Sequence, residues 1–278
     1  MIVHHAAEFE GAGVQLYRRS WLPPGKPKAV VAIVHGYAEH SGRYDWVGNE
    51  LAGAGIAVHA YDLRGHGKSE GPRVLVRSFK EHLDDLDVFL WLVKSEAGDA
   101  PVFLLGHSMG GCIVALEACT RLPQVAGIIL SGPAVAKPSL GFRVMGSAMA
   151  AIAKVRPGFG LRALEATTVS RDSAVVEAYD TDPLVYRGKM PAGMIAAISR
   201  AIKRINRDAF DIRLPLLIVH GTADELCAPE GSRALSAAVG SMDCTLKLYD
   251  GLAHEVLNEP EKAEVLRDIR EWVEARLG

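Results

Sequence analysis

Cysteines and long hydrophobic runs are scarce in this sequence. Only four of its 278 residues are cysteines, and Cys112 and Cys119 would lie about 10 Å apart along one helix, too far for a disulfide. The chain has no run of 18 apolar residues that could cross a bilayer. Residues 1–13 lack the basic start and apolar core of a secretion signal. We therefore expect a soluble protein of a reducing compartment, the cytoplasm.

Neither sign of charge dominates, and histidine does not occur at metal-binding spacing. The 31 basic and 33 acidic residues leave a formal charge of −2, which provides no field to attract nucleic acid. The ten histidines are scattered and form no His-Glu-x-x-His motif. We expect neither a nucleic-acid partner nor a metal or other cofactor.

A complete phosphate-binding loop is missing as well. The glycine-rich stretch "YDLRGHGKSEGPR" (61–73) contains Lys68 and Ser69, but Asp62 stands where such a loop has its first glycine. The dinucleotide-binding fingerprint also fails, because Glu70 stands where its third glycine would let a helix pack closely on its strand. A bound nucleotide is therefore not expected here.

What the sequence does contain is a regular alternation of apolar runs and helical patterns. The runs are continuous, as in strands that are covered on both faces of a parallel sheet. Together with the amphipathic patterns between them, they predict an α/β protein with a doubly wound sheet. Residues 1–22 predict an antiparallel hairpin at the edge of that sheet. The predicted central strands lie within residues 29–37, 55–63, 101–108, 125–133, 214–224 and 244–251.

One interval interrupts this alternation. About 75 residues separate the run at 125–133 from the run at 214–224, roughly twice the length of an ordinary crossover. Its helical segments are rich in methionine, alanine and glycine. We interpret it as a helical cap over the sheet, with a pair of additional core-packing helices as the alternative. The predicted organisation is a core of residues 1–134 and 212–278 with a cap of residues 135–211.

A Gly-x-Ser-x-Gly motif occurs once, as "GHSMG" (106–110), where an apolar run ends and a helical pattern begins. A nucleophilic serine on a strained strand-to-helix turn requires this context, because small flanking residues let the strand and the helix approach each other. Ser108 could equally be an ordinary helix N-cap. The motif alone leaves both interpretations open.

An acid and a base at the ends of later strands favour the nucleophile. Asp224 ends one predicted strand and His254 follows the next, which is the order serine, acid, histidine in this architecture. Each could be a helix cap instead, and Asp62 and Asp250 are rival acids. Asp250 is too close in sequence to His254 to orient it easily from a separate strand. We predict a catalytic triad of Ser108, Asp224 and His254.

Acyl transfer also needs backbone donors for the negative charge that develops on a carbonyl oxygen. Met109, directly after the serine, offers one N–H group. The loop "HGY" (35–37) follows a predicted strand and offers the N–H of Tyr37. A tight turn that merely needs Gly36 for its backbone angle is the alternative for this loop.

Six segments spread over nearly the whole chain add a family resemblance: "HGYAEHSGRY", "YDLRGHGKSEGPR", "GHSMGG", "AYDTDPLVYRG", "HGTADELCAPEGS" and "YDGLAHEVLNEP". In them the chain resembles the monoacylglycerol lipase family of α/β-hydrolases, especially its bacterial members. The resemblance implies a mostly parallel eight-stranded sheet flanked by helices, with an inserted helical cap. It also implies a serine ester hydrolase that cleaves monoacylglycerols without a cofactor. Lysophospholipase or general carboxylesterase activity is the alternative, and a catalytically silent binding module is a more distant one.

The resemblance implies further residues and partners. Glu39, Arg43 and Tyr179 match a polar pocket for glycerol hydroxyls. The first two could instead form an ion pair that braces the loop of Tyr37, and Tyr179 could be plain packing. The loop "DLRGHGKS" is implied to be a structural turn in which Arg64 pairs with a carboxylate or with carbonyls, with binding of a substrate headgroup as the alternative for Arg64. The resemblance together with the apolar cap implies a lipid substrate. The exposed face of the cap could touch a membrane or micelle, with a closed soluble lid as the alternative, and the oligomeric state stays open.

Overall fold

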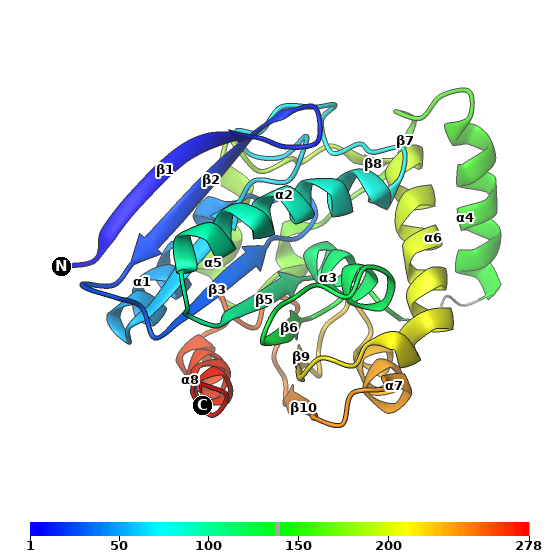
Figure 1. Cartoon of the computed structure of the whole chain (residues 1–278). Coiled ribbons are helices and arrows are strands. Elements are labelled where there is room, and N and C mark those ends of the chain that lie inside the picture. Colours follow the sequence, from blue (N-terminus) through cyan, green and yellow to red (C-terminus); the bar gives the residue numbers. More distant parts are fainter. Residues whose placement is uncertain (137–139, 278) are drawn as a thin grey trace.

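One large sheet forms the centre of the molecule (Figure 1). The computed structural model describes residues 1–136 and 140–277. The strand order is β1-β2-β4-β3-β5-β6-β9-β10; β1 pairs antiparallel with β2, β2 pairs antiparallel with β4, and the other neighbours are parallel. The predicted eight-stranded, mostly parallel sheet with an edge hairpin is therefore confirmed. The strands are β1 (Val3–Glu10), β2 (Gln15–Leu22), β3 (Ala29–Val34), β4 (Ile56–Tyr61), β5 (Val102–His107), β6 (Gly127–Ser131), β9 (Leu216–Gly221) and β10 (Cys244–Tyr249).

The continuous apolar runs form strands because both of their faces are covered. Every residue of β3, β4, β5, β6 and β9 is buried. Side chains of a strand point alternately to the two faces of the sheet, so each of these strands contributes to two separate hydrophobic cores. Because these strands are parallel, their carboxyl ends meet along one edge of the sheet, where the candidate site lies.

Helices cover both faces (Figure 1). The helices α1 (Asp45–Gly53) and α8 (Lys262–Glu274) pack over one core. The other core is covered by α2 (Phe79–Ala97) and α3 (Met109–Thr120), and α7 (Pro229–Ala238) adds Leu235 to it. Within the part of the chain that the structure describes, no helix has the length and apolar character needed to cross a membrane.

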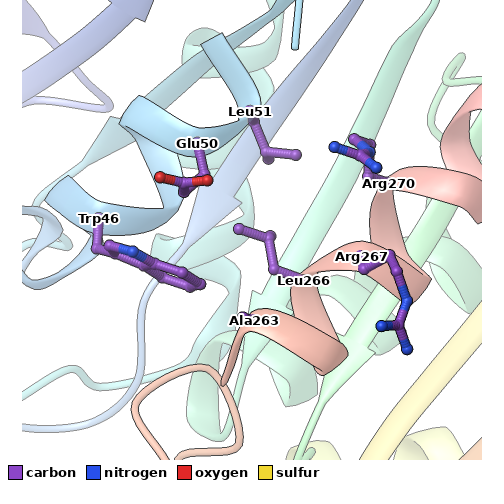
Figure 2. A pocket seen from close by; sticks show the side chains of 7 residues that line it. All are labelled: Trp46, Glu50, Leu51, Ala263, Leu266, Arg267 and Arg270. Atoms are coloured by element: carbon purple, nitrogen blue, oxygen red, sulfur yellow. The ribbon is translucent and has the colours of Figure 1, made fainter. Parts of the chain in front are cut away.

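A small pocket lies between α1 and α8, as Figure 2 shows. Its volume of about 70 Å³ is well below the several hundred Å³ that a lipid-sized ligand fills. It lies over the core opposite to that of α3, so it does not belong to the candidate site. Its lining residues are Trp46, Glu50, Leu51, Ala263, Leu266, Arg267 and Arg270.

The insertion contains helices and also a small antiparallel sheet, which the sequence analysis did not predict. The paired strands are β7 (Gly160–Ala163) and β8 (Lys189–Pro191). The helical elements are α4 (Leu140–Ala153), η2 (Ala166–Thr168), α5 (Ser173–Thr181), α6 (Ala192–Asp208) and η3 (Ala209–Asp211). The two interpretations of the insertion apply to different helices. α6 packs into the core beside α3, as a core-packing helix would, whereas α4 packs on the outside of α6, as part of a cap would. The boundaries at 135 and 211 stay a prediction, and residues 137–139 lie outside the described part.

Candidate active site

The turn at Ser108 joins β5 to α3 in a strained conformation. Ser108 has φ 52° and ψ −115°, a region that costs a non-glycine residue roughly 1–3 kcal/mol. Close packing of the flanking glycines holds it there, because a Cβ atom on Gly106 would lie 2.4 Å from the carbonyl oxygen of Gly110, and one on Gly110 would lie 2.1 Å from the carbonyl oxygen of Val34. Although Ser108 occupies the N-cap position of α3, its side chain makes no capping hydrogen bond there. The simple N-cap interpretation is therefore wrong.

Three side chains predicted to act together lie in hydrogen-bond contact. The Ser108 Oγ atom is 2.8 Å from Nε2 of His254, and Nδ1 of His254 is 2.7 Å from Oδ2 of Asp224. Asp224 follows β9 and His254 follows β10, and both are buried. Since Nδ1–H donates to the carboxylate, Nε2 is left free to accept the hydroxyl proton.

The Asp224 carboxylate is held by more donors than the sequence analysis identified. Its Oδ1 atom accepts from the backbone N–H groups of Leu226 and Cys227, each at 2.8 Å, and Nε2 of His220 lies 3.0 Å from Oδ2. Burial alone would raise the pKa of Asp224, but the hydrogen bonds from His220 and His254 outweigh it and hold the pKa well below its usual range. Asp224 therefore stays ionised beside the imidazole of His254.

His220 is a residue of the site that the sequence analysis missed. It is fully buried at the end of β9, and its Nδ1 atom is 2.6 Å from Oγ of Ser232, which leaves Nε2–H to donate to Asp224 and to the carbonyl oxygen of Cys227. Its position four residues before the acid, in "HGTAD", is the sequence signal that could have indicated it.

The loop after β3 approaches the serine closely. A Cβ atom on Gly36 would lie 3.2 Å from Cβ of Ser108 and 2.9 Å from Oε1 of Glu39, so the loop needs a glycine there for close approach. The alternative of a turn that needs Gly36 for its backbone angle is not supported, because its φ is not positive. The Gly36 N–H donates to Oε1 of Glu39 at 2.6 Å and is therefore occupied. Within residues 1–136 and 140–277, the N–H groups of Tyr37 and Met109 have no hydrogen-bond acceptor. Both remain available beside Ser108.

Glu39, Arg43 and Tyr179 lie together, as the resemblance implies. The Arg43 guanidinium is 3.1 Å from Oε2 of Glu39 and lies 4.7 Å from the ring centre of Tyr179. Tyr44, at the end of η1 (Ser41–Tyr44), donates to Oε1 of Glu39 at 3.0 Å. Burial would raise the pKa of Glu39, but Arg43, two nearby histidines and the Gly36 N–H together outweigh burial and lower the pKa to about 2. This arrangement agrees with the bracing ion pair, whereas a role in binding glycerol hydroxyls stays a prediction.

A fourth buried group, Glu255, completes this network and was also missed. Its carboxylate accepts two hydrogen bonds from Arg43, at 2.6 and 2.7 Å, which is the planar two-bond geometry that arginine favours. Glu255 is the residue directly after His254. The loop that carries Tyr37 and the loop that carries His254 are thus joined by the chain of charges Glu39, Arg43 and Glu255.

The glycine-rich loop after β4 makes structural contacts, as the resemblance implies. Arg64 donates to both carboxylate oxygens of Asp85 on α2, at 2.6 and 2.7 Å. Asp62 accepts from Ser41 and from the backbone N–H of Lys68. Asp62 therefore braces this loop and is not the acid beside His254.

Neither the remaining rival acid, Asp250, nor the neighbouring thiol of Cys227 replaces a member of the triad. Asp250 accepts from the Thr222 hydroxyl at 3.1 Å on the surface, away from His254. The thiol of Cys227 lies beside Ser108, and burial raises its pKa far above the ordinary value. A thiol that keeps its proton is a poor nucleophile, so Ser108 is the group positioned for attack.

The cap lies against both loops of the site. The backbone N–H of Glu255 donates to the carbonyl oxygen of Val169, and that of Tyr186 donates to the carbonyl oxygen of Ala38, both at 2.8 Å. These bonds fix the segment around α5 over the loops that follow β3 and β10. The cap is therefore a wall of the candidate site.

Comparisons with known proteins agree with this geometry. Residues 25–261 match the family described as serine aminopeptidase, S33. The chain is 40% identical to a monoacylglycerol lipase of Mycolicibacterium smegmatis over 95% of either chain, and 35% identical to a monoglyceride lipase of Mus musculus over 96% of this chain and 89% of the relative. The crystal structure of a monoacylglycerol lipase from Paleococcus ferrophilus superimposes with a TM-score of 0.83 at 34% identity, covering 94% of this chain and 99% of the other. The chain therefore belongs to the serine aminopeptidase, S33, family of α/β-hydrolases and, within these serine hydrolases, to the monoacylglycerol lipase family.

Proposed function

We propose that the protein hydrolyses monoacylglycerols to a fatty acid and glycerol through an acyl-enzyme on Ser108. The contacts from Ser108 through His254 to Asp224 carry this proposal. The relatives named monoacylglycerol or monoglyceride lipase support the substrate class. The proposed reaction is ester hydrolysis at a serine, in which the chain supplies the nucleophile, the base and the acid that orients the base.

In the first half of the reaction, Nε2 of His254 accepts the proton of Ser108 as Oγ forms a bond to the ester carbonyl carbon. The tetrahedral intermediate collapses, the bond to glycerol breaks, and the glycerol oxygen takes the proton back from His254. Water then attacks the acyl-enzyme in the same way and releases the fatty acid with Ser108 restored. Asp224 keeps His254 oriented and stabilises the imidazolium that forms in each half.

The N–H groups of Tyr37 and Met109 are the proposed donors to the tetrahedral oxyanion. Both flank Ser108, and both are left without an acceptor among the described residues. Donors aimed at a charge that develops only in the transition state lower the barrier by about 3–4 kcal/mol each. The network of Glu39 and Arg43 holds the loop of Tyr37 in place and, in this proposal, offers its polar surface to the glycerol hydroxyls.

The cap supplies the proposed contact with the lipid phase. Large apolar side chains are exposed along α4 and the connection that follows it, where Val155 is 82% and Phe159 is 47% exposed. Lys154 and Arg156 are exposed beside them. Apolar side chains with neighbouring cations favour the interface of an anionic membrane, from which an insoluble monoacylglycerol would be drawn.

Labelling with a fluorophosphonate probe tests the nucleophile. The wild-type protein should react and lose activity, while Ser108→Ala should neither react nor hydrolyse monoacylglycerol above a rate roughly a million-fold lower. Ser95→Ala, which removes an exposed hydroxyl on α2 far from the triad in the sequence, serves as the control and should behave as wild type. Hydrolysis by Ser108→Ala at the wild-type rate would contradict the proposal.

A substrate panel tests the lipid class separately. Rates on monoacylglycerol, triacylglycerol, lysophosphatidylcholine, a short soluble ester and an aminoacyl amide are compared under the same conditions. Monoacylglycerol should have the highest kcat/KM. A preference for the lysophospholipid or the short ester would keep the serine mechanism and replace the substrate.

A further inference from the structure

The strand β1 forms an outer edge of the sheet that no neighbour protects. It is eight residues long, its register with β2 continues unbroken from Val3↔Leu22 to Glu10↔Gln15, and all of its residues except Phe9 are exposed. The sequence of β1, "VHHAAEFE", contains neither proline nor lysine. Long, regular edge strands without such residues readily pair with another strand. The edge at β10, by contrast, is six residues long and carries Lys247 within it.

The backbone groups that β1 presents to solvent can be identified from its turn. Gly11 N–H donates to the carbonyl oxygen of Val14 at 2.8 Å, and hydrogen-bonded pairs alternate with non-bonded pairs along an antiparallel ladder. The residues of β1 whose N–H and C=O groups point away from β2 are therefore His4, Ala6, Glu8 and Glu10. Any strand that pairs with this edge must bond to these four.

The side chains of β1 also divide between the two faces of the sheet. His4 lies on the face of α1, where its Nε2 atom is 2.9 Å from Oδ1 of Asn49. Phe9 lies on the face of α2, with its ring centre 6.0 Å from that of Phe89. Because faces alternate along a strand, Ala6 and Glu8 share the face of His4, and Val3 shares the face of Phe9.

We propose that β1 is a self-complementary docking surface through which two copies of the chain pair edge to edge into one continuous sixteen-stranded sheet. A two-fold axis that is perpendicular to the sheet and passes midway between the two Ala6 residues makes the α1 face of one copy continuous with the α1 face of the other, and likewise the two α2 faces. It places His4 opposite Glu8 of the second copy, twice, so that an imidazole faces a carboxylate. It also places Val3 opposite Phe9 of the second copy, again twice, on the other face.

The neighbouring registers are less complementary. Centring the axis on Ala7 places Glu8 opposite Ala6, and His5 opposite Phe9, of the second copy. Centring it on His5 places the two His5 side chains opposite each other and leaves Glu8 opposite Ile2. In the register centred on Ala6, the pairs His4–Glu8, Ala6–Ala6 and Glu8–His4 join residues whose backbone groups all point outward, so each pair exchanges two hydrogen bonds.

The active site does not obstruct this pairing. β1 is separated from β5, which leads to Ser108, by three strands, or about 19 Å at the usual spacing of strands. The occupant is a second copy of this chain because the imidazole, carboxylate and apolar side chains of one β1 lie opposite matching partners on another. A single pair of strands buries a modest area, so we expect a reversible dimer.

Sedimentation velocity over a range of about 1 to 100 μM tests the proposal. Wild type should shift from monomer to dimer with concentration. Glu8→Lys replaces the carboxylate that faces the His4 imidazole by an ammonium, which cannot accept a hydrogen bond, and should weaken association at least about tenfold. His4→Glu combined with Glu8→Lys should restore it, because a carboxylate then faces the new ammonium. Glu10→Lys, one step along the same face, is the matched control and should dimerise as wild type does.

Circular dichroism and fluorophosphonate labelling establish that each variant is folded. A wild-type protein that is monomeric at every concentration would overturn the proposal. So would a dimer that Glu8→Lys leaves intact, or one that Glu8→Lys and Glu10→Lys weaken equally. Failure of the double variant to regain association would exclude the register centred on Ala6.

Discussion

Arg43 is the residue on which two loops of the active site converge. Its side chain is only 10% exposed, and it pairs with Glu39 from the loop after β3 and with Glu255 from the loop after β10. Removing one member of a buried ion pair lowers the free energy of unfolding far more than removing one member of a surface pair, because the remaining charge stays buried without its partner. The position of His254 should therefore depend on Glu255.

Glu255→Gln tests this dependence. It removes the charge but keeps the shape, so we expect the free energy of unfolding to fall by about 1–3 kcal/mol and kcat to fall about tenfold because His254 is held less firmly. Urea denaturation and steady-state kinetics on a soluble ester measure the two effects.

The matched control is Glu261→Gln. Glu261 pairs with Arg171 on the surface, where the two side chains are 42% and 43% exposed, and its loss should cost less than about 1 kcal/mol without changing kcat. Equal effects of the two variants would show that the buried network does not position the site.

At this scale the sequence allowed the triad to be predicted, and the family resemblance drew attention to Glu39 and Arg43, but neither indicated His220 or Glu255. Ser108, Asp224 and His254 each follow a recognisable strand, so their convergence follows from the topology alone. Glu255 acts through contacts that depend on how two loops meet, and a single sequence carries no direct signal for such contacts. His220 stands at a recognisable spacing before Asp224, but its role depends on how the segment after β9 turns back on it.

The cap is the element whose internal structure was least predictable. Its helices follow from apolar periodicity, but β7 and β8 are four and three residues long, and pairing between such short strands depends on the tertiary setting. The core strands were predictable because burial on both faces makes them continuously apolar.

The connection between α4 and β7 should bind lipid surfaces. Replacing Val155 and Phe159 together by serine should reduce co-sedimentation with anionic vesicles and lower the rate on vesicle-borne monoacylglycerol, while kcat/KM on a soluble short ester stays unchanged. Trp91→Ser on α2, which removes a side chain that is 68% exposed, is the control and should leave vesicle binding intact. Equal loss in both variants would indicate nonspecific adsorption.

For the molecule as a whole, one buried carboxyl group makes stability depend on pH. Glu117 on α3 is 1% exposed, and burial, with a further contribution from Asp87, raises its pKa to about 8. An unfolded chain releases this proton near pH 4.3. Between about pH 4.5 and 8 the folded state therefore holds more protons, and the free energy of unfolding falls as pH rises.

Glu117→Gln should remove this dependence, because the amide is neutral at every pH and has nearly the same shape. Thermal unfolding is followed from pH 5 to pH 8, and Tm should fall less steeply with pH in the variant than in wild type. The difference between the two slopes corresponds to at most about 1.4 kcal/mol per pH unit in the free energy of unfolding. Glu271→Gln, at an exposed position on α8, should retain the wild-type slope. A slope in Glu117→Gln equal to that of wild type would assign the pH dependence to other groups.

The bridge from Arg43 to Glu255 spans 212 positions of the chain, and the acid and the imidazole beside Ser108 also come from its last quarter. During synthesis, the nucleophile and its loop leave the ribosome long before the residues that activate and anchor them. A nascent chain therefore has no functioning site until translation is almost finished. Incomplete chains that lack this last quarter should therefore be unable to hydrolyse an ester.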